Sequence, residues 1–137
     1  MATAIYYYSL TGNVKAFAEK RAAETGADLF EIRMAVKYNK LTAFLVGCPY
    51  AINQRSSAII PPEDNFEPYD DIVIMVPIWA GNPAPPVNGI IGCLPPDKTV
   101  SLICLSGSGK QSLVKTAALI IRRGCTIKEA TCLKTGA

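Results

Sequence analysis

Five short runs along the chain have the length and composition of β-strands: residues 3–8, 28–33, 72–76, 100–105 and 125–133. The run 72–76 is continuous and rich in β-branched residues, which is typical of a strand buried on both faces. The run 28–33 alternates apolar and polar residues, which predicts an edge strand with one covered face.

Between these runs, apolar residues recur at helical spacing. A helix is predicted over 13–25, ended by Gly26 in a left-handed cap. Further helices are predicted over about 39–48, 86–94 and 110–123, and the polar, proline-containing stretch 56–68 predicts a surface loop. The predicted inner face of the first helix is Val14, Phe17, Ala18, Arg21, Ala22 and Thr25. That of the last helix is Leu113, Val114, Ala117, Ile120 and Ile121.

The alternation of strands and helices predicts an α/β fold, doubly wound around a five-stranded parallel sheet. Right-handed crossovers leave few possible topologies, of which the strand order 2-1-3-4-5 is the leading one. Ligands bind to such a sheet beyond the C-terminal ends of its strands, at the switch between strands 1 and 3. The length of 137 residues suits a single domain over 1–137.

Composition narrows the function classes. The formal charge of +3 comes from scattered basic residues, which argues against a nucleic-acid footprint. No apolar run approaches the ~20 residues that span a membrane, and no charged leader precedes the first strand, so a cytoplasmic protein is expected.

The chain has no histidine and no C-x-x-C pair, which leaves little for zinc binding or imidazole catalysis. The five cysteines are interpreted as reduced thiols, mostly in the core, with one redox-active thiol as the alternative.

The segment from Tyr8 to Val14 joins the first strand to the first helix. The first N–H groups of a helix lack partners within the helix and carry partial positive charge, so they suit a phosphate. Ser9 and Thr11 add hydroxyl donors, and Gly12 has no Cβ to keep a ligand away. An ordinary strand-to-helix turn with Ser9 as its N-cap would show the same pattern.

Ser9-Leu10-Thr11-Gly12-Asn13 resembles the phosphate loop of the flavodoxin family, Ser/Thr-x-Thr-Gly-Asn-Thr. Val14 departs from it, because the family usually has a threonine there. The segment 69–82, with its Tyr-Asp, a hydrophobic run and Pro77-Ile78-Trp79-Ala80-Gly81-Asn82, resembles a second flavodoxin segment, and the likeness extends from residue 4 to about 133.

The loops after strands 3 and 4 complete the predicted site. The first has the only tryptophan and several prolines, and a rigid loop with a large flat ring suits a planar aromatic ligand. Trp79 packed in the core is the alternative. The second loop, Ser106-Gly107-Ser108-Gly109, is small enough for backbone amides to approach a ligand edge, although such loops are common before helices.

What the resemblance implies is FMN. Its phosphate would contact Ser9, Leu10, Thr11, Gly12, Asn13 and Val14, and its ring would lie between Pro77, Ile78, Trp79, Ala80, Gly81 and Asn82 on one side and Ser106, Gly107, Ser108 and Gly109 on the other. The loop after strand 4 lacks the second aromatic residue of many flavodoxins, which leaves one face of the ring open. The flavin would carry the chemistry, with no catalytic residue and no metal.

The resemblance implies an FMN-binding redox protein, either an electron carrier or a small reductase, whose partner is a redox protein or NAD(P)H. The alternatives are a binding or regulatory module with a degraded flavin site, or a subunit of a larger complex. The residues after 133 leave no length for the C-terminal helix of a flavodoxin. An uncovered sheet face near strands 1 and 3 is therefore expected. It predicts another subunit, such as a homo-oligomer formed through this face, further residues that cover it, or a truncated variant.

Overall fold

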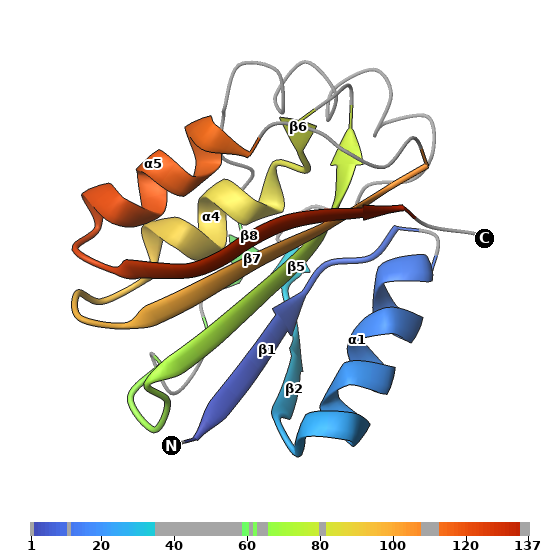
Figure 1. Cartoon of the computed structure of the whole chain (residues 1–137), viewed down its shortest axis with the longest axis horizontal. Helices are drawn as coiled ribbons and strands as arrows, with labels where there is room; N and C mark the ends of the chain where they lie inside the picture. Colours follow the sequence, from blue (N-terminus) through green and yellow to red (C-terminus); the bar gives the residue numbers. More distant parts are fainter. Residues whose placement is uncertain are drawn as a thin grey trace.

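The computed structural model in Figure 1 describes residues 2–10, 12–34, 59–60, 62, 66–79, 82–107 and 113–134. The predicted helix over 39–48 lies outside these residues. Within them, no helix is long and apolar enough to cross a membrane.

A parallel sheet forms the centre of the molecule. Its strands are β1 (Thr3–Tyr7), β2 (Asp28–Glu31), β5 (Asp71–Trp79), β7 (Thr99–Ser106) and β8 (Thr126–Lys134). They run in the order β2-β1-β5-β7-β8, and every neighbouring pair is parallel. The predicted order and fold class are therefore confirmed, with β2 at an edge and β5 at the centre.

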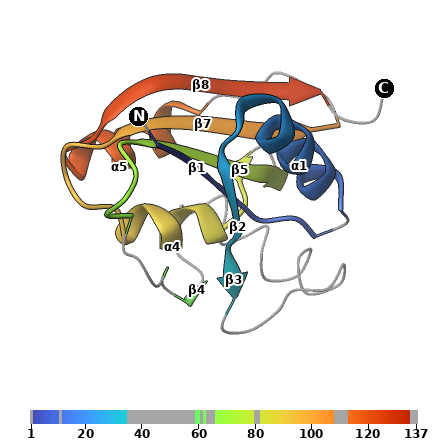
Figure 2. The same ribbon diagram turned by 90° about the horizontal axis from the view of Figure 1, so that it is seen from below.

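Within the described residues, three helices pack on the two faces of this sheet. The helix α1 (Asn13–Thr25) lies on one side, and α4 (Pro86–Gly92) and α5 (Val114–Arg122) lie on the other (Figures 1 and 2). The bounds predicted for α1 are confirmed, as is its cap at Gly26, which has φ +74°. Val14 and Ala18 are its buried residues.

The buried face of α5 differs from the prediction. Leu113, Thr116 and Ile120 face the core, whereas Val114 and Ile121 are exposed. The prediction is therefore confirmed at Leu113 and Ile120 and wrong at Val114 and Ile121, because the way the helix packs on β8 and α4 decides which of its residues are covered. The helix also begins at Val114 rather than near 110.

The segment before β5 is more buried than a surface loop. It contains β4 (Ile59–Ile60), which pairs with β3 (Arg33–Met34) in a separate two-stranded sheet (Figure 2). Phe66 is fully buried, and its ring lies 4.8 Å from that of Tyr6. The loop predicted over 56–68 is wrong at these positions.

Strand β5 is also longer than predicted. It extends through Pro77, Ile78 and Trp79, and β6 (Asn82–Pro83) returns antiparallel beside it as a sixth strand. The N–H of Ala84 donates to the carbonyl of Pro77 at 2.9 Å and closes this hairpin. The expected loop after strand 3 is therefore largely a β-hairpin.

The sheet face beside α1 is buried at β1 and β5. Ile5 and Met75 are fully buried, and Phe17 and Ala22 of α1 pack against this cluster. The expectation of an uncovered face near these strands is wrong, and the homo-oligomer expected from it stays a prediction.

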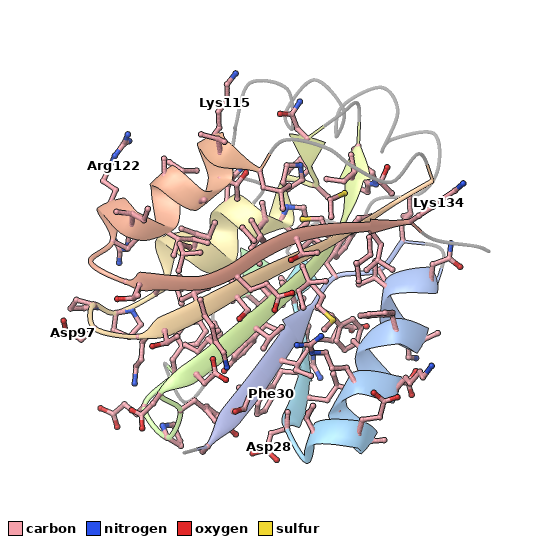
Figure 3. All side chains as sticks on the ribbon, in the orientation of Figure 1. Asp28, Phe30, Asp97, Lys115, Arg122 and Lys134 are labelled. Atoms are coloured by element: carbon pink, nitrogen blue, oxygen red, sulfur yellow. The ribbon has the colours of Figure 1, made fainter. Side chains whose placement is uncertain are left out.

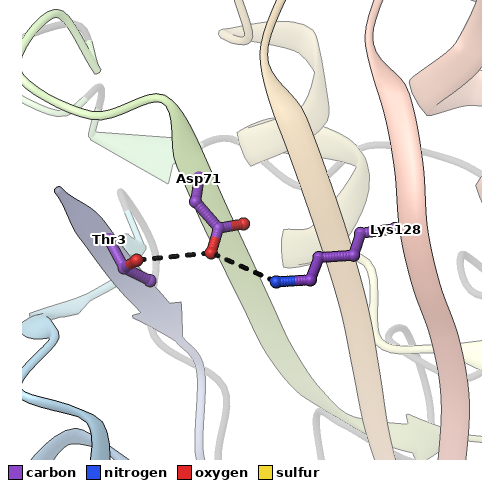
Figure 4. Close-up of polar contacts among 3 residues, drawn as sticks. All are labelled: Thr3, Asp71 and Lys128. Atoms are coloured by element: carbon purple, nitrogen blue, oxygen red, sulfur yellow. Dashed lines mark hydrogen bonds and ion pairs between the residues drawn. The ribbon is translucent and has the colours of Figure 1, made fainter. Parts of the chain in front are cut away.

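Near the start of the strands the same face is polar: Asp71 accepts a hydrogen bond from Thr3 and lies 3.9 Å from the Lys128 ammonium (Figure 4).

Candidate functional site

The connection from β1 to α1 presents backbone donors at the end of the sheet. The N–H of Tyr8 donates to the carbonyl of Met75 at 3.0 Å, which holds the chain beside β5 for one residue beyond β1. The helix then starts after Gly12, and its first bond is from the N–H of Ala16 to the carbonyl of Gly12. The amides of Asn13 and Val14 belong to the first turn and have no acceptor within the helix.

Ser9 does not cap the helix as the ordinary-turn alternative required. Gly12 is the N-cap residue, and the Ser9 hydroxyl oxygen accepts the N–H of Gly12 at 2.9 Å. This bond uses Ser9 as an acceptor, so its own O–H can still be donated to a ligand. The bond holds the loop in shape beside the positive end of α1.

Gly12 is needed for its backbone conformation. Its φ of +98° lies in the left-handed region, where an L-residue is strained. A Cβ built on Gly12 would meet no atom within 4 Å. Backbone conformation, rather than crowding within the protein, therefore explains the glycine here.

Trp79 is part of the core, as the alternative interpretation predicted, and it also borders the candidate site; its contact with a planar ligand stays a prediction. Its side chain is 9% exposed and belongs to the main core cluster, and it also lines a surface cavity. Its ring meets that of Tyr8 nearly edge-on, at a centroid distance of 5.9 Å. The indole is thus held by the core while part of its surface borders the cavity.

The end of β7 forms the third side of the cavity. Ser106 is buried at the last position of the strand, and Gly107 follows it at the surface. Leu105 also borders the cavity and was not predicted. It is the last apolar residue of the strand predicted over 100–105, so its position one residue before Ser106 was the available signal.

A cavity of about 170 Å³ brings the three connections together. Its lining residues are Ser9, Leu10, Asn13, Val14, Pro77, Ile78, Trp79, Leu105, Ser106 and Gly107. Gly12 adjoins it in the loop, whereas Asn82 pairs with Trp79 in the hairpin and is not part of the lining. The remaining predicted site residues lie outside the described residues: Thr11, Ala80, Gly81, Ser108 and Gly109.

The described residues that line the cavity are uncharged. They include no carboxylate that would repel an anion, and the amides and the dipole of α1 favour negative charge at this end. Apolar and aromatic side chains from β5 and β7 form the other walls. The arrangement suits a molecule that joins an anionic group to a flat apolar ring.

None of the described cysteines is among the residues that line the cavity. Cys104 and Cys125 are buried, Cys93 and Cys132 are half-buried, and these four are thiols rather than disulfides. Burial, reinforced by the neighbouring Cys132, raises the pKa of the Cys104 thiol well above its usual value. Among the described residues, no cluster of histidine, cysteine or carboxylate could hold a metal ion.

No protein-family model and no curated protein sequence matches the chain. Several solved structures, however, match the chain. A provisionally named flavoprotein from Bacteroides eggerthii is 27% identical, with a TM-score of 0.78 over 96% of this chain and 87% of that one. Another from Bacteroides uniformis is 22% identical, with a TM-score of 0.80 over 99% and 92%. A flavoprotein in complex with FMN, from Lactobacillus acidophilus, is 20% identical, with a TM-score of 0.71 over 96% and 92%.

The sheet order and the three converging connections define a flavodoxin-like α/β protein, with a site at the topological switch. Structural neighbours that include a flavodoxin from Bacillus cereus and one from Archaea agree with this assignment. The chain therefore has the flavodoxin-like fold.

Proposed function

We propose that this protein binds FMN and acts as a redox protein of the flavodoxin type. The observation that carries the proposal is the cavity itself, because residues from three connections far apart in sequence line one space. The FMN complex among the structural neighbours supports the choice of mononucleotide.

The donor set fits a phosphate. The Ser9 hydroxyl and the amides at the start of α1 would bind it, and dipoles rather than a cation would offset its charge. Thr11 would contribute as the resemblance implies. Val14 belongs to the same buried cluster as Tyr7 and Ala18. As a valine it offers its amide but no hydroxyl.

The walls of the cavity fit the ring. Trp79 and Ile78 from β5, with Ser106 and Gly107 after β7, would flank it. The volume of about 170 Å³ is below the roughly 300–1,000 Å³ of typical ligand pockets. Part of the flavin would therefore remain exposed, where a partner protein or NAD(P)H can reach it. When bound, FMN supplies one- and two-electron redox chemistry, and this chain binds it, orients it and shields one side from water.

Titration of the flavin-free protein with FMN, followed by quenching of flavin fluorescence, tests the proposal. Riboflavin, which lacks the phosphate, is the control and should bind at least ten-fold more weakly. Equal affinities would contradict the role given to the α1 end. Absence of binding at millimolar FMN would contradict the proposal and favour the binding or regulatory module.

The same preparation separates a carrier from a reductase. Steady oxidation of NADH or NADPH by the FMN-loaded protein, with free FMN at equal concentration as the control, indicates a reductase. If the rate does not exceed that of free FMN, the protein is an electron carrier that requires a protein partner.

A further inference from the structure

The outward face of α5 combines apolar and basic side chains. Val114 is 73% exposed and Ile121 is 60% exposed. They are two of the three large hydrophobic residues that are exposed in the described part of the chain, the third being Ile60. Three further residues of the same helix are exposed as well: Lys115, Ala118 and Arg122.

These five residues form one continuous surface. At about 100° per residue, they fall within roughly a third of the helix circumference. Leu113, Thr116 and Ile120 lie on the other side and are buried. The core therefore fixes the rotation of α5, and the apolar stripe at Val114, Ala118 and Ile121 stays at the surface.

The charge of this surface has one sign. α5 contains no acidic residue, and no described carboxylate forms an ion pair with Lys115 or Arg122. Both side chains point away from the body of the molecule in Figure 3. Arg123 is committed elsewhere, since its guanidinium donates twice to the carbonyl of Leu94.

We propose that the outward face of α5 docks an acidic amphipathic helix of a partner protein. Val114 and Ile121 would pack into its apolar stripe, as ridges of one helix fit the grooves of another, and Lys115 and Arg122 would face its carboxylates. A second copy of this chain fits less well, because a symmetric contact would bring like charges together. An anionic membrane fits less well too, because two large apolar and two basic side chains provide little binding to lipid.

In sequence, α5 follows β7, whose last residue, Ser106, lines the cavity. The docking proposal rests on the exposure and charge of α5 and does not require flavin to bind.

The probe is a synthetic helical peptide with leucine at positions i, i+4 and i+7 flanked by glutamates. It is added to the isotope-labelled full-length protein, and backbone amide shifts are followed by NMR. We expect shift changes that concentrate at residues 113–123 and weaken as salt is raised. A peptide with lysine in place of every glutamate is the control and should bind at least ten-fold more weakly.

Matched substitutions test the surface itself. Ile121→Glu should weaken binding at least ten-fold, about 1.4 kcal/mol, whereas Ile60→Glu, at the exposed residue on β4, should not. Arg122→Glu should weaken it several-fold, whereas Lys20→Glu, on the exposed side of α1, should not. Amide spectra that keep their dispersion show that each variant is folded.

Several results would overturn the proposal. They are absence of shifts at millimolar peptide, equal binding of the lysine peptide, or equal losses from Ile60→Glu and Ile121→Glu. Self-association that Ile121→Glu abolishes would assign the surface to a second copy. Binding to vesicles containing phosphatidylserine, if that variant abolishes it, would assign the surface to a membrane.

Discussion

The ring of Tyr8 meets the indole of Trp79 nearly edge-on, with an interplanar angle of 79° and a centroid distance of 5.9 Å. Tyr8 comes directly after β1 and Trp79 ends β5, so the contact joins two of the three sides of the site. Edge-to-face pairs contribute about 0.5–1.5 kcal/mol beyond the area that they bury. Tyr8 therefore helps to hold the ring that we expect to border the flavin.

Replacing Tyr8 tests this support. Tyr8→Leu should lower the free energy of unfolding by about 0.5–1.5 kcal/mol more than Tyr8→Phe, because phenylalanine keeps the ring pair. Urea denaturation followed by tryptophan fluorescence measures both. FMN affinity should fall in Tyr8→Leu as the indole loosens. Equal stabilities of the two variants would show that the ring contact contributes little.

The Ser9 hydroxyl is expected to bind the phosphate. A hydrogen bond to a charged group contributes about 1.5–3 kcal/mol, so Ser9→Ala should weaken FMN binding by roughly ten- to a hundred-fold. Fluorescence titration measures this change. Riboflavin binding should be almost unaffected, because riboflavin has no phosphate. A parallel loss for both ligands would indicate that Ser9 acts by shaping the loop through its bond to Gly12.

A substitution at Val14 tests the effect of the one departure from the flavodoxin phosphate loop. Val14→Thr should strengthen FMN binding by about ten-fold if the new hydroxyl reaches the phosphate. Val14 is 2% exposed, so without ligand the hydroxyl would be buried and the free energy of unfolding should fall by about 1–3 kcal/mol. Denaturation with and without FMN measures both effects. A stability loss with no gain in affinity would show that the side chain points away from the phosphate.

Gly12 should resist substitution because of its positive φ. Gly12→Ala should lower the free energy of unfolding by about 1–2 kcal/mol. Gly92→Ala is the matched control: it lies in α4, its added Cβ also meets nothing within 4 Å, and it should be neutral or stabilise by about 0.5–1 kcal/mol. Urea denaturation compares them. Similar effects from both variants would contradict the strain argument.

The buried Cys104 thiol should make stability depend on alkaline pH. Burial raises its pKa in the folded protein, so above the ordinary thiol pKa of about 8.5 only the unfolded chain loses this proton. The contribution is complete below that pH, and the free energy of unfolding should fall by up to about 1.4 kcal/mol per pH unit above it. Denaturation between pH 8 and 10 measures the slope, below the range where Tyr7, whose pKa is also raised, would add to it. The slope should be smaller in Cys104→Ala; an unchanged slope would exclude Cys104 as its source.

The hydrophobic periodicity predicted the bounds of α1, the order of strands and helices along the chain predicted a parallel sheet, and the handedness of the crossovers made the observed strand order the leading one. These features depend on local periodicity and on chain connectivity, both of which are written in the sequence. The candidate phosphate loop was likewise visible, because glycine and hydroxyl residues between a strand and a helix indicate a backbone conformation. What the sequence determined by itself was therefore the framework and the end of the sheet at which a ligand would bind.

Tertiary contacts decided the rest. Trp79 is part of a strand because β6 folds back on it, Phe66 is buried because Tyr6 lies beside it, and α5 exposes Val114 because β8 and α4 cover its other side. Each of these depends on residues distant in sequence, and several faces of one short helix can look equally apolar. Only the folded chain determines which face is exposed to water. These tertiary contacts therefore decide the position of Trp79 at the candidate site and the exposure of the outward face of α5.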